Sequence, residues 1–259
     1  MIKFFRKIRY DLMEKKPPAG RAGKTGKPAW QVGRYLKYAI GEIVLVVIGI
    51  LIALQINNWN ETRKDHIAES NILQDIQGSI STDIQQLNLR IELAKNDVQS
   101  ANIILKHLEK NLPYNDSLNK HFVIITSTAG KAFTPQISAY KVLESKGIDL
   151  ISNNQLKKDI LNLYNIDYNM LVYEYENFHK NIHDYGRPIA RSLFNTTSNN
   201  SDQLPELQPV DYKSLRSNVE LINTLKIIIS NDRRIHEMLI DLIDKCQEIQ
   251  NVIDAELKK

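Results

Sequence analysis

The stretch YLKYAIGEIVLVVIGILIALQINNW, residues 35–59, decides the architecture that we expect for this chain. Charge within it is confined to Lys37 near one edge and Glu42 inside. An α-helix rises about 1.5 Å per residue, so roughly 20 apolar residues cross the hydrocarbon core of a bilayer. Tyr35 and Trp59 flank the run, as aromatic residues do at membrane–water interfaces. The stretch therefore predicts a transmembrane helix over residues 35–59.

Basic and acidic residues are divided unevenly by this stretch. Residues 1–37 contain seven Lys and four Arg against Asp11 and Glu14, whereas the region after residue 59 is mildly acidic. Because Lys and Arg accumulate on the cytoplasmic side of transmembrane helices, we expect a cytoplasmic N-terminus and an external C-terminal region. A cleaved signal peptide is the alternative interpretation, but its basic leader would be about forty residues long and no small-residue cleavage pattern follows it.

The basic leader divides into two parts. Residues 1–15 combine apolar and basic side chains at helical spacing, which predicts an amphipathic helix on an anionic membrane surface, although a merely solvated leader is the alternative. The expected surface contacts come from Lys3, Phe5, Arg6, Lys7 and Arg9. Residues 16–34, rich in Pro, Gly and Lys, are expected to form a flexible cytoplasmic linker. Lipid is the expected partner of this region, and no nucleic-acid partner is expected.

One face of the predicted transmembrane helix carries an unusual set of residues. Glu42, Val46, Gly49 and Ala53 follow one another at spacings of four, three and four, which places them on a single helical face. Gly49 and Ala53 form a small-xxx-small element that lets a second helix approach closely. A carboxyl group facing lipid is unfavourable by roughly 2.5 kcal/mol or more near the bilayer centre. We therefore expect pairing with a second copy or a protein partner; the alternative is that Glu42 reaches towards Lys37 and the headgroups.

Beyond residue 59 the apolar residues recur every three or four positions, which is the period of amphipathic helices. This spacing predicts long helices over 61–110, 154–194 and 218–258, shorter helices over 118–129 and 135–145, and a loop over 195–210. Residues 121–126 are rich in β-branched side chains and could instead form a short strand. The expected fold class is all-α: one N-terminal transmembrane helix followed by an elongated extracytoplasmic bundle of four main helices, residues 60–259.

Residues capable of metal chemistry are few in the external region. Glu176, His179 and His183 lie at helical spacing and could supply one carboxylate and two imidazoles. A di-iron bundle would need a second Glu-x-x-His step, which no other predicted helix provides. A polar helix face explains the same three residues without a metal. No cofactor is therefore expected, and an extracytoplasmic enzyme with a metal or hydrolytic site here is the alternative function.

The segment 133–165 is the most distinctive part of the external region. Gly147 is the expected helix stop, and residues 152–154 are the expected cap of the next helix. Thr134, Gln136 and Tyr140 could line a groove for a ligand or partner; a well-packed helical hairpin explains the same apolar pattern. Cys246 is the single cysteine and is expected to be a small buried core residue, the alternative being a disulfide with its own copy in a dimer.

Three segments resemble a known group of sequences: KFFRKIR at 3–9, GRYLKYAIGEI at 33–43 and GILIALQINNWNE at 49–61. Together they resemble the opening of a family of uncharacterised bacterial single-pass inner-membrane proteins. The resemblance covers about the first sixty residues and is looser over 140–165. It implies a location in the bacterial cytoplasmic membrane and a helical periplasmic or external domain, and it brings no activity and no site residues.

These observations favour a non-enzymatic function. We expect a membrane-anchored sensor, scaffold or assembly protein whose extracytoplasmic helices bind a protein partner or ligand. This interpretation needs only an anchor and a helical domain, both of which the sequence predicts, whereas the enzymatic alternative needs ligating or catalytic partners for residues 176–183.

Overall fold

The computed structural model describes residues 29–128, 132–197 and 206–259, most of which are helical. The chain divides into two compact units, Met1–Asn60 and Glu61–Lys259, and we call the second the helical unit. Within the first unit, the described residues belong to helix α2, Ala29–Glu109, which continues into the second. The leader residues predicted to touch a membrane surface, Lys3, Phe5, Arg6, Lys7 and Arg9, lie outside the described residues.

Helix α2 ends where the sequence predicts, shortly before Pro113. Asn111 adopts the left-handed conformation with φ 53°. Its amide donates to the carbonyl of Leu108, and the amide of Leu112 donates to the carbonyl of His107 at 3.0 Å. This pair of bonds is a Schellman cap, which satisfies carbonyls that the last helical turn would otherwise leave free. The prediction of a helix over 61–110 is confirmed.

Short helical pieces follow α2. They are η1 (Asp116–Leu118), α3 (Asn119–Phe122), η2 (Val123–Ile125), α4 (Ser138–Lys146) and η3 (Ile148–Leu150). The helical interpretation of 118–129 is confirmed over part of its length, and the alternative of a strand at 121–126 is wrong. Gly147 ends α4 with φ 100°, a conformation that side chains other than glycine rarely adopt.

The predicted helix over 154–194 is confirmed as one helical run containing two π turns. It consists of α5 (Asn154–Asn162), η4 (Leu163–Asp167), α6 (Tyr168–Asn181), η5 (Ile182–Gly186) and α7 (Arg187–Leu193). Its start is capped by Asn153, whose side-chain oxygen accepts from the amides of Gln155 and Leu156. Gly186 lets this run approach η2 closely, because a Cβ at this position would lie 2.0 Å from the carbonyl oxygen of Ile125.

The loop predicted over 195–210 is wrong in part, because its two ends pair as a hairpin. Strands β1 (Phe194–Thr197) and β2 (Glu206–Pro209) are antiparallel. Phe194 packs against Phe122 with ring centroids 4.8 Å apart, and Leu207 is also buried. The strands are short and mostly polar, so they lack the alternation of apolar and polar residues that predicts a strand. The fold is therefore mostly helical rather than all-α.

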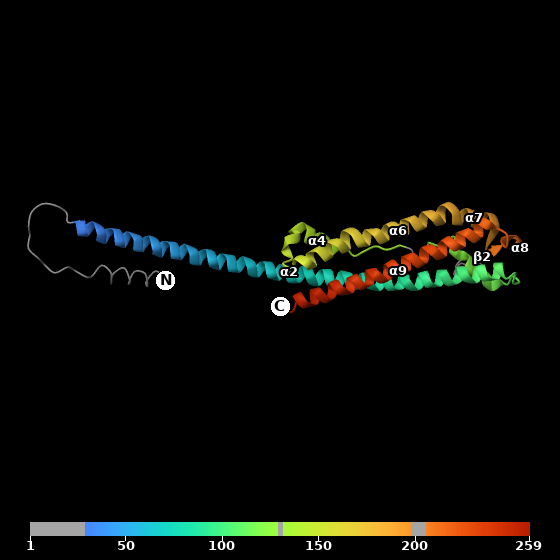
Figure 1. Ribbon diagram of the computed structural model, residues 1–259, viewed down its shortest axis with the longest axis horizontal. Helices are drawn as coiled ribbons and strands as arrows, with labels where there is room; N and C mark the ends of the chain where they lie inside the picture. Colours follow the sequence, from blue (N-terminus) through green and yellow to red (C-terminus); the bar gives the residue numbers. More distant parts are fainter. Residues whose placement is uncertain (1–28, 129–131, 198–205) are drawn as a thin grey trace, which may run out of the picture. The chain divides into compact units, whose positions relative to one another are not determined.

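After the hairpin come α8 (Tyr212–Leu215) and the long α9 (Val219–Glu256), capped by Asn218. Within the helical unit, the α5–α6 run and α9 lie alongside the second part of α2 (Figure 1). Four main helices were expected, but three long helical segments form the described core, because α3 and α4 are too short to count as a fourth. The helix predicted over 218–258 is confirmed.

Two clusters of buried apolar side chains fill the helical unit. The larger joins Ile76 and Ile80 of α2 to Leu171 of α6 and Leu239 of α9. The second contains the last turns of α2, α3, η2, α7, the hairpin and the start of α9. Fully burying a Leu or Ile side chain stabilises a fold by about 1.5–3 kcal/mol, so these clusters are the main source of the unit's stability.

Candidate functional site

The face predicted to pair within a membrane lies on the first part of α2. The most apolar 18-residue window within Ala39–Glu109 of this helix has a mean hydropathy of 2.6 and is not buried by any described part of the protein. Glu42, Val46, Gly49 and Ala53 are all exposed. No described neighbour lies within 4 Å of the Cβ position at Gly49. By length and composition, α2 is therefore able to cross a membrane.

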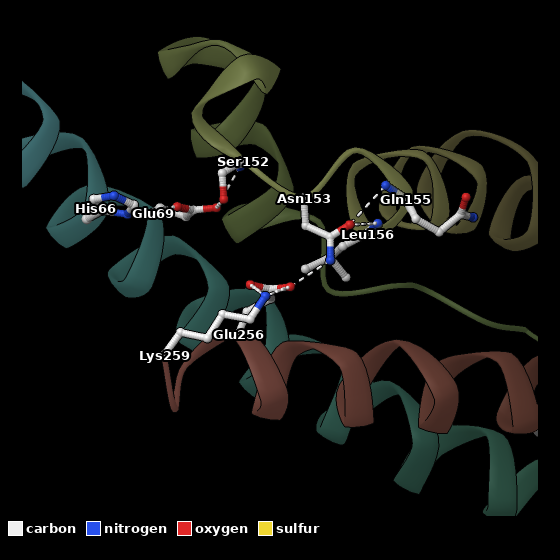
Figure 2. A network of polar contacts seen from close by, with 8 residues as sticks. All are labelled: His66, Glu69, Ser152, Asn153, Gln155, Leu156, Glu256 and Lys259. Atoms are coloured by element: carbon white, nitrogen blue, oxygen red, sulfur yellow. Dashed lines mark hydrogen bonds and ion pairs between the residues drawn. The ribbon is translucent and has the colours of Figure 1, made fainter.

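A network of polar contacts ties α2 to the junction between η3 and α5 (Figure 2). Glu69, on α2, is 8% exposed although it carries a carboxylate. Its Oε1 atom accepts from the backbone amide of Ser152 at 2.6 Å and from the Ser152 hydroxyl at 2.7 Å. The Nδ1 atom of the exposed His66 lies 3.6 Å from the other carboxylate oxygen. The buried charge is thus held by hydrogen bonds rather than left unpaired, which is the condition for tolerating it.

The neighbouring residue extends this network to the end of α9. Asn153 caps α5 with its side-chain oxygen and donates from its amide nitrogen to Glu256 at 2.6 Å. Lys259 contacts the same carboxylate at 2.7 Å. Hydrogen bonds from Lys259 and from Asn153 hold the pKa of Glu256 below its ordinary value. Figure 2 shows Asn153 between the first turn of α5 and Glu256, so one side chain links two helices.

A second polar group lies deeper, in the core between α2 and α6. Asp83 is fully buried, and both of its carboxylate oxygens accept from the amide of Gln136, at 3.0 and 3.3 Å. The hydroxyl of Tyr168 also hydrogen-bonds to it. Burial raises the pKa of Asp83, and the two hydrogen bonds partly oppose that shift. Asp83 therefore fastens the chain before α4 onto α2 at an electrostatic cost.

Tyrosine side chains surround this carboxylate. The Tyr168 hydroxyl lies 3.6 Å from the sulfur of Cys246, on α9. Burial raises the pKa of the Cys246 thiol to about 12, so the thiol is protonated at neutral pH and is a poor nucleophile. Tyr164 is also buried, and its hydroxyl finds no hydrogen-bond partner among the described residues. Burial raises the pKa of Tyr164 and Tyr168 as well.

The residues predicted to line a groove do not share one environment. Tyr140 is buried, stacks on Tyr164 with ring centroids 4.5 Å apart and accepts a hydrogen bond from Asn165 at 2.6 Å. Thr134 and Gln136, in contrast, have exposed side chains, and Gln136 contributes its backbone amide to Asp83. The segment thus packs as a helical hairpin core, and the hydrogen bond from the Gln136 amide to Asp83 holds it on α2.

The three weak metal candidates are also separated in environment. Glu176 and His183 are exposed, and His183 contacts the neighbouring Asp184 at 2.9 Å. His179 is partly buried, and its Nε2 atom has no hydrogen-bond partner in the described part of the chain. His183 lies in the π turn η5, whose wider turn shifts the helical spacing on which the prediction depended. Among the described residues, no three His, Cys, Asp or Glu side chains are grouped as metal ligands.

A family model described as "Family of unknown function (DUF6090)" matches residues 42–224. The chain belongs to this family. Comparison with curated proteins and with solved structures found no match. The DUF6090 match begins at Glu42, in the apolar segment, and includes Glu69, Asp83 and Asn153. It ends within α9, so Cys246 and Glu256 lie beyond it.

The sequence pattern alone did not single out the two buried carboxylates of α2 in this DUF6090 chain, Glu69 and Asp83. Asp83 stands three residues after Ile80 and four before Leu87, which is a core position by helical spacing. Glu69 similarly precedes Ile72 by three residues. A charged residue at a position that helical spacing assigns to the buried face was the signal that the sequence offered. That signal does not identify the hydrogen-bond partners, which come from segments more than fifty residues away.

Proposed function

We propose that this DUF6090 protein is a non-enzymatic, membrane-anchored sensor, scaffold or assembly protein. In this proposal residues 35–59 cross the bacterial inner membrane and residues 1–34 lie in the cytoplasm. Residues 60–259 form an extracytoplasmic helical bundle that binds a protein partner or ligand. The face formed by Glu42, Val46, Gly49 and Ala53 pairs with another transmembrane helix.

The exposure of the apolar segment carries this proposal. Ile43, Leu51 and Ile56 are exposed by 62%, 58% and 61%, and no described part of the protein covers the apolar window. Each such side chain gains about 1.5–3 kcal/mol when it leaves water, so an apolar surface of this length is unfavourable in aqueous solution. A bilayer removes that penalty, and a helix already satisfies its own backbone hydrogen bonds.

The orientation rests on charge. The basic leader precedes the apolar segment, and the residues that follow it are mildly acidic overall. Lys and Arg are retained on the cytoplasmic side of inner-membrane proteins, which supports an external location for the helical unit.

The way that polar groups are used in the helical unit supports a binding role. Glu69 and Asp83 are occupied by backbone amides, so they act as fasteners between segments. The only cysteine carries a buried thiol with a raised pKa. These are properties of a unit built to hold a shape, which suits a protein that presents a surface to a partner.

Topology is tested with single cysteines in intact cells. We expect Lys146→Cys, on the exposed end of α4, to react with a membrane-impermeant maleimide after the outer membrane is opened. Lys24→Cys should react only after the inner membrane is lysed, and the unmodified chain should stay unlabelled because Cys246 is buried. The reverse labelling pattern would overturn the orientation, and recovery of the protein in the soluble fraction would overturn the anchor.

Partner binding is tested by affinity isolation of the full-length protein from membranes in mild detergent. We expect a partner or a second copy to be recovered with the wild type and lost with Glu42→Leu. Val44→Leu, an apolar exchange away from the pairing face, is the matched control and should retain the partner. If the partner is recovered equally with all three proteins, Glu42 is not part of the site. If the wild-type protein is isolated with no other protein and no second copy, the proposed partner binding is wrong.

A further inference from the structure

The part of α2 in the helical unit presents an exposed face that no other described element covers. Six residues at a spacing of three or four define it, and we call them the α2 face: Ile67, Asn71, Gln74, Gly78, Thr82 and Gln85. All six are exposed, whereas Ile72, Leu73, Ile76 and Ile80 on the other side of the helix are buried. Ile67 remains 52% exposed although it is a large apolar residue.

This face is almost free of charge. Among the exposed residues between Ile67 and Gln85, only Asp75 is charged. The exposed face of α9, in contrast, is rich in charged residues: Lys226, Arg233, Arg234, Glu237, Asp241 and Asp244. Depletion of charge is typical of the buried centre of protein interfaces, while a charged helix face is typical of a surface that stays in water.

Gly78 occupies the middle of the α2 face. Glycine in a helix interior lowers helix stability relative to alanine, so the presence of Gly78 within α2 needs a structural explanation. No described atom lies within 4 Å of the position that a Cβ would take, so the space above the backbone is open. A glycine with open space above it lets another helix approach closely, as small residues do between paired helices.

The spacing of the α2 face continues along the sequence into the predicted pairing face. Counting back from Ile67 at about 3.6 residues per turn reaches positions 64, 60, 56, 53, 49, 46 and 42. The last four are Ala53, Gly49, Val46 and Glu42. Lys64 is the one basic residue in this series, and its long side chain can turn its charge outward to water.

We propose that the α2 face is the surface on which a second copy of this chain packs, in a parallel dimer. The inference rests on the proposed function, because anchors in one membrane hold both copies in the same orientation. A symmetric parallel pair places residues near the axis beside their own copies. Like charges near the axis would face each other, so the scarcity of charge between Ile67 and Gln85 favours packing against a second copy.

Disulfide crosslinking of the full-length protein in native membrane vesicles tests the proposal. Gln74→Cys on the α2 face is compared with Asp241→Cys on α9 and Met170→Cys on α6, which also exposes apolar residues. We expect oxidation to link Gln74→Cys into a dimer at least about fivefold more than either other variant, because a disulfide requires close Cα atoms. Equal crosslinking at residues 74 and 241 would overturn the proposal, as would preferential crosslinking at residue 170.

Charge insertion provides a second, independent readout. We expect Gln74→Glu to lower the dimer fraction about tenfold in mild detergent, and high salt to restore part of it. Gln247→Glu on the exposed face of α9 is the matched control and should leave the dimer intact. An unchanged dimer in Gln74→Glu would overturn the proposal. A wild-type protein that is monomeric but still sediments with membranes would sink this inference alone, whereas loss from membranes would sink the proposed function.

Discussion

Two buried carboxylates on the same helix, Glu69 and Asp83, are held in different ways. Glu69 lies at the end of the helical unit and accepts two hydrogen bonds from Ser152, within a network that reaches the more exposed Asn153 and Glu256. Asp83 lies in the core, and burial raises its pKa in spite of its hydrogen bonds. The network around Glu69, which we call the end network, joins helices through hydrogen bonds, while the core carboxylate fixes one segment at an electrostatic cost.

The largest effect is expected when the core carboxylate is replaced by an apolar side chain. Asp83→Leu leaves the Gln136 amide without its acceptor and the Tyr168 hydroxyl without its carboxylate partner. Unpaired buried groups of this kind lower the free energy of unfolding by about 3 kcal/mol in total. Urea unfolding of the full-length protein in detergent, followed by tyrosine near-ultraviolet circular dichroism, measures this. A loss below about 1 kcal/mol would show that Asp83 is not the fastener of the 132–137 segment.

The end network should respond next most strongly, at its capping residue. Asn153→Ala removes two hydrogen bonds to the first turn of α5 and one to Glu256. Losing a helix cap lowers the free energy of unfolding by about 0.5–2 kcal/mol, so we expect a value near the upper end of that range. Asn154→Ala, one residue later and exposed, is the matched control in the same unfolding assay and should change little. Equal effects of the two variants would contradict a specific role for Asn153.

A neutral isostere separates the hydrogen bonds of Asp83 from its charge. Because the folded-state pKa of Asp83 is raised above 3.8, ionisation is disfavoured in the fold, and stability is lost as the pH rises through the folded-state pKa. Asp83→Asn keeps an acceptor for the Gln136 amide and cannot ionise. We therefore expect this variant to be more stable than the wild type at neutral pH, with the difference closing in acid. The unfolding free energy measured across pH checks this, and a gap that widens in acid would reverse the assignment.

The smallest effect is expected at the edge of the end network. Lys259→Gln removes the ion pair with Glu256, but the Lys259 side chain is 71% exposed. Exposed ion pairs contribute about 0–1 kcal/mol and weaken with salt, so the unfolding free energy should fall by less than about 0.5 kcal/mol. Repeating the measurement at high salt should remove even this difference. A decrease in the free energy of unfolding as large as that caused by Asn153→Ala would mean that Lys259 contributes as much to the end network as Asn153 does.

The helices and their ends followed from local sequence. The period of apolar residues gave α2 and α9, and Gly147 and Asn153 act at the helix end and start where their residue types predict. The hairpin did not follow, because β1 and β2 are too short and polar to show alternation. The partners of Glu69 and Asp83 did not follow either, because each carboxylate bonds to a backbone amide distant in sequence.

Local sequence is enough to predict the apolar segment, the charge difference across it, and the helical period of the remainder, because each depends on residues close together along the chain. The packing of distant segments determines which carboxylates are buried, which amides they accept from, and which face of α2 stays uncovered. It also determines that Gly186 meets the carbonyl of Ile125, which makes glycine necessary there. These features depend on how distant segments pack against one another, and no local spacing encodes that packing.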